Sequence, residues 1–268
     1  MRFLFWNIKR NPLGQILAEI VQEHSIEVVI LAECRDQITI LQSLNANTDR
    51  PFHLTDSGKT RVVIYTRFPI EFMQPEHSDD KFLTVRRMSL LGRKEILLAA
   101  THLPSKSWSA STQKAIASRI SKKIRGVEEK VGHSRTVLVG DLNMSPFEER
   151  VTSAEGLHAV MTREIAKKKA RNIHEESYPF FYNPMWSRFG DATQGPPGTY
   201  YRAGSSFMEY FWHMYDQVLI RPDLLDLFDI EALQVLVKCR STSFLRRSGV
   251  PDVARISDHL PLLFDLRI

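Results

Sequence analysis

The chain has little cysteine, no long apolar run and no excess of glycine or proline, and each shortage excludes a class of protein. Two cysteines in 268 residues are too few for a disulfide framework or a cysteine-based zinc site, so we expect a cytoplasmic protein. The longest apolar runs have five residues, whereas a membrane-spanning helix needs roughly 20. With 12 glycines and 13 prolines, the composition is neither collagen-like nor disordered.

The net charge and the length of the chain narrow the possible partners and the number of domains. Lysine and arginine number 36 against 31 acidic residues, and the net charge of +5 favours polyanionic partners such as nucleic acid or anionic lipid. The N-terminal apolar stretch Phe3 to Trp6 is shorter than the core of a secretion signal, so we expect no secretion. No linker or internal repeat divides the chain, and we expect one domain over residues 1–268.

A short apolar run that stops at a polar residue occurs four times. Asn7 follows Phe3 to Trp6, Glu33 follows Val28 to Ala32, His102 follows Ile96 to Thr101, and Asp141 follows Thr136 to Gly140, with Asn143 two residues later. Runs of this length and composition are typical of buried strands. Each predicted strand therefore carries its polar group at its C-terminal end.

Two later segments have the reverse order. Asp216 precedes the apolar segment 217–220, and Ser257-Asp258-His259 precede the segment 260–264. If these strands run antiparallel to the first four, all of the polar groups lie on one rim of the sheet assembly, where α/β folds usually bind ligands.

The rest of the chain supplies covering helices and further strands. Apolar residues at helical spacing predict amphipathic helices over residues 14–23 and 108–131. Residues 61–66, 70–73 and 82–90 are predicted strands, with a turn at Ser57-Gly58. The sequence thus predicts an α/β protein with two packed sheets flanked by helices.

The predicted rim would crowd the carboxylates of Glu33, Asp141, Asp216 and Asp258, which repel one another unless a cation lies among them. Oxygen donors without a thiolate cluster favour Mg²⁺, with Mn²⁺ as the alternative, and Glu33 is the first candidate ligand. Histidines beside such a cation can donate hydrogen bonds to a phosphate. The pattern indicates hydrolysis of phosphate esters.

Six segments, in chain order, resemble the motifs of the endonuclease/exonuclease/phosphatase superfamily, which has the deoxyribonuclease I-like fold. They are Trp6-Asn7, Leu31-Ala32-Glu33, Thr101-His102-Leu103, Gly140-Asp141-Leu142-Asn143, Tyr215-Asp216-Gln217-Val218 and Ser257-Asp258-His259. Each match is short, but their order and strand-end positions together are specific. The resemblance implies a four-layer α/β sandwich with two mixed sheets flanked by helices.

The resemblance also implies roles for these residues. Glu33 would hold the metal, with Asn7 and Asp258 nearby. Asp141 and Asn143 would orient and deprotonate the attacking water. The remaining implied catalytic residues are His102 and His259, which would brace the phosphate, and Asp216, which would position His259. The abasic-site enzymes of the superfamily usually carry a tyrosine where this chain has His102, so lesion repair is the less expected activity.

Half of the aromatic residues lie within residues 178–215. Exposed rings would stack on bases, whereas the alternative is a satellite hydrophobic cluster under a long loop. The candidate substrate-binding residues are Trp186, Tyr200, Tyr201, Lys59 and Arg61. The basic run Arg163, Lys167, Lys168, Lys169 and Arg171, on a predicted helix, is either a solvated face or a phosphate-steering patch.

The leading hypothesis is a divalent-metal-dependent phosphodiester hydrolase, namely a nuclease that cleaves DNA or RNA. The alternative is a phosphatase or phosphodiesterase that acts on a small-molecule or lipid phosphate ester, because the same rim would serve either substrate. A binding module that uses the same fold without catalysis is a third possibility. The sequence predicts no particular protein partner.

Overall fold

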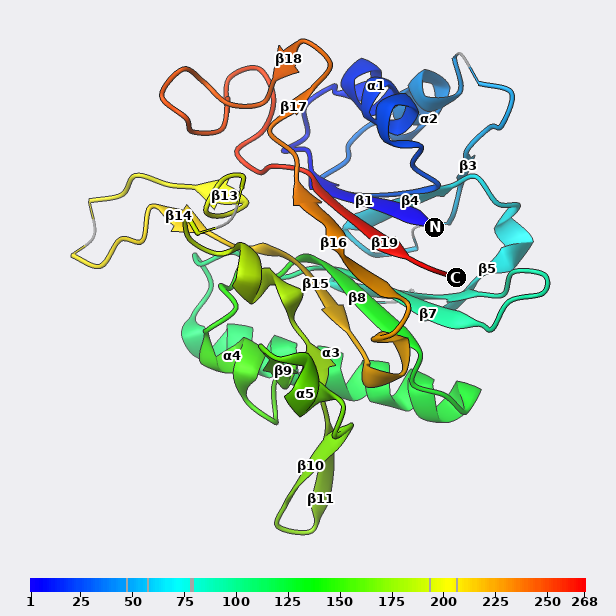
Figure 1. The fold of residues 1–268 in the computed structure, drawn as a ribbon, viewed down its shortest axis with the longest axis vertical. Helices are drawn as coiled ribbons and strands as arrows, with labels where there is room; N and C mark the ends of the chain where they lie inside the picture. Colours follow the sequence, from blue (N-terminus) through cyan, green and yellow to red (C-terminus); the bar gives the residue numbers. More distant parts are fainter. Residues whose placement is uncertain (47, 57, 78–79, 193, 206) are drawn as a thin grey trace.

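Two mixed β-sheets pack face to face at the centre of the computed structural model, which describes residues 1–46, 48–56, 58–77, 80–192, 194–205 and 207–268 (Figure 1). The first sheet has the strand order β16 (Phe228–Val235), β19 (Leu262–Leu266), β1 (Arg2–Asn7), β2 (Val28–Ala32), β4 (Val62–Thr66) and β3 (His53–Leu54). The second sheet has the order β5 (Met73–His77), β6 (Leu83–Met88), β7 (Ile96–His102), β8 (Thr136–Asp141), β15 (Asp216–Ile220), β12 (Phe181–Tyr182) and β9 (Ala159–Val160).

Successive side chains of the central strands face opposite sides of the sheet, and this alternation allows each sheet to pack on both of its faces. In β1, Phe3 and Phe5 belong to the core between the two sheets, whereas Leu4 and Trp6 face the helices α1 (Gly14–His24) and α2 (Gln37–Asn45). This is the period-2 pattern of a strand that is buried on both faces.

The second sheet is covered by α3 (Ala110–Val131). The α3 residues Ile116, Ile120 and Ile124 pack with Leu97 of β7 and Leu138 of β8. Figure 1 shows α1 and α2 on one side of the paired sheets and α3 on the other. The predicted four-layer α/β sandwich is therefore confirmed.

The strand directions agree with those predicted from the order of polar and apolar residues. Strand β1 pairs in parallel with β2, and β7 in parallel with β8. Strand β19 is antiparallel to β1, and β15 is antiparallel to β8. The polar ends of these strands consequently lie on one side of the assembly.

Several local predictions differ from the structure. Helix α2 was not predicted; the Asp36 side chain caps it by accepting a hydrogen bond from the Thr39 amide at 3.0 Å. Residues Ile70–Phe72 form a single 3₁₀ turn before β5 rather than a strand. The turn predicted at Ser57-Gly58 lies partly outside the described residues, because Ser57 is not among them.

The prediction of one helix for the basic run was wrong. Helix α5 ends after four residues (Arg163–Ala166), Lys169 takes a left-handed φ of 67°, and Ala170 starts the strand β10. A non-glycine residue in the left-handed region interrupts an α-helix. The remaining short elements are α4 (Glu149–Thr152), η2 (Pro184–Arg188), η3 (Pro222–Leu224), β10 (Ala170–Ile173), β11 (Glu176–Pro179), β13 (Tyr200–Tyr201), β14 (Trp212–His213), β17 (Lys238–Cys239) and β18 (Thr242–Ser243).

No helix in the described part of the chain is both long and apolar enough to span a membrane.

Candidate active site

Asp141 is the centre of the polar rim. Strand register places His102 on β7 and Asp216 on β15 directly opposite it, one on each side. From the first sheet, the Asn7 Nδ2 donates a hydrogen bond to Asp141 Oδ2 at 3.0 Å. The two sheets therefore meet at this buried carboxylate, which is 1% exposed.

The residue before Asp141 has to be glycine. A Cβ atom on Gly140 would lie 2.0 Å from the carbonyl oxygen of Thr101 in the parallel neighbour β7. A Cβ atom and a carbonyl oxygen cannot approach this closely, so any larger residue would displace a strand, and Gly140 permits the observed spacing between β7 and β8. That spacing keeps His102, which the register places opposite Asp141, close to it, and the His102 Nε2 lies 3.6 Å from Asp141 Oδ2.

His259 and Asp216 form a buried pair beside Asp141. The His259 Nδ1 lies 2.8 Å from Asp216 Oδ2, and the His259 Nε2 lies 3.8 Å from Asp141 Oδ2. Burial lowers the pKa of His259, but the carboxylates of Asp216 and Asp141 raise it more, so that its pKa rises to about 10. The two carboxylates therefore favour the protonated imidazole, which can donate a hydrogen bond through Nε2.

Glu33 and Asn143 lie just beyond strands in left-handed backbone conformations, with φ of 52° and 50°. Such conformations cost non-glycine residues free energy and concentrate at functional sites. The Glu33 carboxylate lies 3.9 Å from His102 Nε2 and 3.6 Å from the Arg10 Nε. The Asn143 amide N–H donates to Asp141 Oδ1 at 2.8 Å, which fixes the second oxygen of Asp141.

These groups surround one cavity of about 350 Å³. Its lining residues are Asn7, Lys9, Glu33, His102, Ser105, Lys106, Ser107, Asp141, Asn143, Tyr200, Arg202, Tyr215, Asp258 and His259. We call it the active-site cavity. Asp258 is paired there with Lys9, whose Nζ lies 3.1 Å from Asp258 Oδ2.

The donors of the cavity fit a hard divalent cation. Glu33, Asp141 and Asp258 contribute carboxylates and Asn7 an amide, with no thiolate among the lining residues; oxygen donors of this kind suit Mg²⁺ or Mn²⁺. A second, more compact set of possible metal ligands also exists, because ligand atoms of Asp141, Asp216 and His259 lie within 4.8 Å of one another. In that group the His259 Nδ1 and Asp216 Oδ2 are already hydrogen-bonded to each other, so we do not favour it as the cation site.

The predicted substrate-binding residues separate in the structure. Tyr200 lines the active-site cavity, and its ring centroid is 4.7 Å from that of His259. Arg61 lines an adjoining cavity of about 270 Å³, which shares Glu33 and His102 with the active-site cavity. Trp186 and Tyr201 are half-buried and Lys59 is exposed, and none of these three lines the active-site cavity.

Sequence reasoning missed several residues of the cavity. Lys9, Lys106, Arg202 and Tyr215 all line it, but only two carry a sequence signal. Lys9 comes two residues after Asn7, and Tyr215 immediately precedes Asp216. Lys106 and Arg202 lie in loops, where nothing in the local pattern indicates which way a side chain faces.

Known proteins of this architecture include several nucleic-acid enzymes. The chain is similar to the 3′-5′ exonuclease NExo from Neisseria meningitidis (16% identity, TM-score 0.59, all of both chains) and to an AP endonuclease from Archaeoglobus fulgidus (13% identity, TM-score 0.56, all of both chains). It is similar as well to the 3′ phosphatase NExo from Neisseria bound to a product DNA hairpin (16% identity, TM-score 0.57, 99% of both chains). No curated protein sequence matches the chain significantly.

A sequence profile matches nearly the whole chain. The profile describes the Endonuclease/Exonuclease/phosphatase family and covers residues 4–259, from β1 to the histidine of the buried pair. The chain belongs to the endonuclease/exonuclease/phosphatase family.

Proposed function

We propose that this protein is a divalent-metal-dependent phosphodiester hydrolase that cleaves nucleic acid. The observation that carries the proposal is the position of Asp141, a buried carboxylate held on both oxygens and faced by two histidines. The Asp141 oxygens accept hydrogen bonds from the side-chain Nδ2 of Asn7 at 3.0 Å and from the backbone N–H of Asn143 at 2.8 Å. Fixed in this way, the carboxylate can orient a water molecule and accept its proton as the water attacks phosphorus.

The two histidines are placed to bind the phosphate that is attacked. His259 is aligned by Asp216, and its Nε2 faces Asp141. His102 lies on the other side of Asp141, with its Nε2 within 4 Å of both Asp141 and Glu33. Hydrogen bonds from these groups would stabilise the negative charge that increases on the phosphate oxygens in the transition state.

Glu33 would hold the cation, with Asn7 and Asp258 as neighbouring donors. A bound Mg²⁺, with Mn²⁺ as a substitute, would act as a Lewis acid on the phosphate. Lys9, which pairs with Asp258, offsets part of the negative charge around the cavity. We assign it no direct role in catalysis.

Three observations favour nucleic acid as the substrate. The net charge is +5, the cationic side chains of Lys106 and Arg202 line the active-site cavity beside the phosphate-binding groups, and one similar structure holds a DNA hairpin. Basic side chains near a reactive phosphate bind the flanking phosphates of a polymer. Cys34 and Cys239 are unpaired, which fits the cytoplasmic location that we propose.

The test is hydrolysis of labelled single- and double-stranded DNA and RNA, beside a small phosphodiester, with Mg²⁺, with Mn²⁺ and with EDTA. We expect metal-dependent cleavage of a polymer, and a loss of about 10²- to 10⁴-fold in Asp141→Asn, the usual contribution of a general base. Asp49→Asn is the matched control, because Asp49 is exposed. Turnover of the small diester alone would instead indicate a small-molecule or lipid phosphate.

A further inference from the structure

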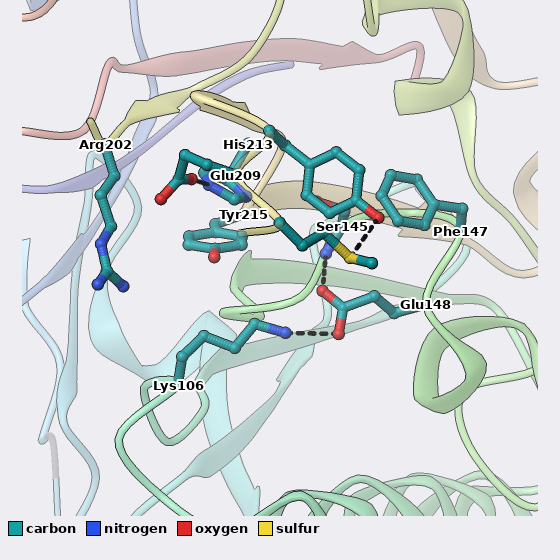
Figure 2. Close-up of a pocket in the computed structure, with 10 residues that line it drawn as sticks. Lys106, Ser145, Phe147, Glu148, Arg202, Glu209, His213 and Tyr215 are labelled. Atoms are coloured by element: carbon teal, nitrogen blue, oxygen red, sulfur yellow. Dashed lines mark hydrogen bonds and ion pairs between the residues drawn. The ribbon is translucent and has the colours of Figure 1, made fainter. Parts of the chain in front are cut away.

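A second pocket, drawn in Figure 2, shares part of its lining with the active-site cavity. It has a volume of about 390 Å³ and is lined by Lys106, Ser145, Phe147, Glu148, Arg202, Met208, Glu209, Tyr210, His213 and Tyr215. We call it the aromatic pocket. Lys106, Arg202 and Tyr215 line both cavities, so a molecule bound at the phosphate site can extend into this pocket.

A column of rings connects the two cavities. The Tyr200 ring lies 4.7 Å from that of His259 and stacks on Tyr215 at 5.2 Å with an interplanar angle of 22°. Tyr215 in turn stacks on His213 at 4.7 Å and 29°. Tyr215 and His213, which line the aromatic pocket, are thus connected to His259 through the ring of Tyr200.

The outer wall of the pocket is aromatic and exposed. Phe147 and Tyr210 pack at 5.5 Å between centroids, yet they are 37% and 53% exposed. Met208, on the same wall, is 73% exposed. Large apolar side chains that gather around a pocket mark a binding surface more often than isolated ones do.

Fixed polar groups complete the lining. Glu148 accepts hydrogen bonds from the Ser145 amide and from Arg150, both at 2.8 Å, and is paired with Lys106. Glu209 lies 3.4 Å from His213 Nε2. Figure 2 shows Lys106 and Glu148 meeting on one side of the pocket, with Glu209, His213 and Tyr215 on the other. Charged groups on both sides disfavour an acyl chain, because its burial would desolvate them without compensation.

We propose that the aromatic pocket binds the unpaired base of the nucleotide next to the scissile phosphate, an inference that rests on the proposed nuclease function. A base offers flat faces to the rings and hydrogen-bonding edges to the glutamates, and Lys106 and Arg202, which line both cavities, would face the phosphate that joins the two sites. A base within a duplex presents neither its faces nor its pairing edge. The preferred substrate is therefore single-stranded nucleic acid or a strand end whose base is not paired.

The test measures binding by fluorescence anisotropy, in EDTA so that no substrate is consumed. The probes are a labelled single-stranded DNA hexamer and the same hexamer with abasic tetrahydrofuran residues. We expect Tyr210→Ala to weaken binding of the normal hexamer about tenfold, within the range that stacking of a base on an aromatic ring supplies. Binding of the abasic hexamer should not change.

Two further variants make the test specific. Tyr210→Phe keeps the ring and should restore binding, which separates stacking from a folding defect. Phe207→Ala removes a fully exposed ring from the same loop but outside the pocket lining, and it should bind like the unchanged protein.

The outcomes distinguish the two proposals. Equal loss of affinity for normal and abasic hexamers, or no loss in Tyr210→Ala, would overturn the base pocket even if the protein cleaves nucleic acid. Base-dependent loss of binding in a protein that hydrolyses no polymer would support the pocket and overturn the nuclease function.

Discussion

The His259 Nδ1 lies 2.8 Å from Asp216 Oδ2, and both residues are buried although they are 43 positions apart in the chain. Asp216 opens β15 of the second sheet, while His259 precedes β19 of the first sheet. The pair therefore couples the two sheets at the same place where Asn7 reaches Asp141. Both contacts depend on the packing of the sheets, so the site forms only when the sandwich is assembled.

Asp216→Asn should lower kcat by about 100-fold with little change in KM. The substitution preserves size but removes the negative charge that aligns His259, and the loss of a donor that stabilises charge in the transition state usually costs about this factor. Steady-state kinetics on the preferred oligonucleotide measure the change. A rise in KM with unchanged kcat would show that Asp216 serves substrate binding instead.

Glu33→Gln should raise the Mg²⁺ concentration needed for half-maximal activity by at least about tenfold. A neutral amide is a weaker ligand than a carboxylate for a hard cation, and losses of about 10- to 100-fold follow even from changes to the groups around metal ligands. The measurement is a Mg²⁺ titration of the initial rate. Glu175→Gln is the control, because Glu175 is exposed in the β10–β11 hairpin, remote from the rim. An unchanged Mg²⁺ requirement would exclude Glu33 as the principal ligand.

The sequence was sufficient to predict which strands carry the rim residues, because each such residue directly adjoins a buried apolar run. Asp141 and Asp216 show why the direction of the strands could also be predicted: one follows its strand and the other precedes it, so only antiparallel strands bring both to one edge.

Other features were not predictable from local pattern. The pairing of Lys9 with Asp258 joins opposite ends of the chain, and the placement of Lys106 and Arg202 depends on the course of loops. Helix α2 contains the β-branched residues Ile38 and Thr39 near its start, which weakens a helical signal. These elements are fixed by tertiary packing rather than by propensity.

Gly140→Ala should destabilise the fold by about 1–3 kcal/mol or more, the usual cost of forcing an extra methyl group into a packed interior. The added Cβ would meet the Thr101 carbonyl oxygen at 2.0 Å, so β7 and β8 must separate and His102 must move away from Asp141. Urea denaturation measures the stability, and the oligonucleotide assay should show a parallel loss of activity.

Gly126→Ala is the matched control. Gly126 lies inside α3, and a Cβ there meets nothing within 4 Å. Because alanine favours the helix over glycine, this variant should be more stable by about 0.5–1 kcal/mol. A loss of stability in both variants would mean that the Thr101 contact is not the cause.

Because His158 is buried, the free energy of unfolding of the protein should decrease as the pH falls below neutrality. The side chain is 3% exposed, its ring lies 4.4 Å from that of Phe180, and burial lowers its pKa from the usual value. The unfolded chain therefore binds a proton that the folded protein excludes. The stability that neutral His158 provides is complete above the unfolded pKa of about 6.5. It is lost as the pH falls from that value towards the lower pKa of the folded protein, by at most about 1.4 kcal/mol per pH unit.

The comparison is with His158→Asn, chosen because position 158 has a φ of 51°, which asparagine tolerates. The variant loses ring packing and should be less stable at pH 7.5, but its free energy of unfolding should fall less between pH 7.5 and pH 5.5 than that of the unchanged protein. Urea denaturation at both pH values gives the two slopes. Equal slopes would mean that His158 is protonated in the folded protein at pH 5.5, and that the acid sensitivity arises from other buried histidines such as His213, whose pKa burial also lowers.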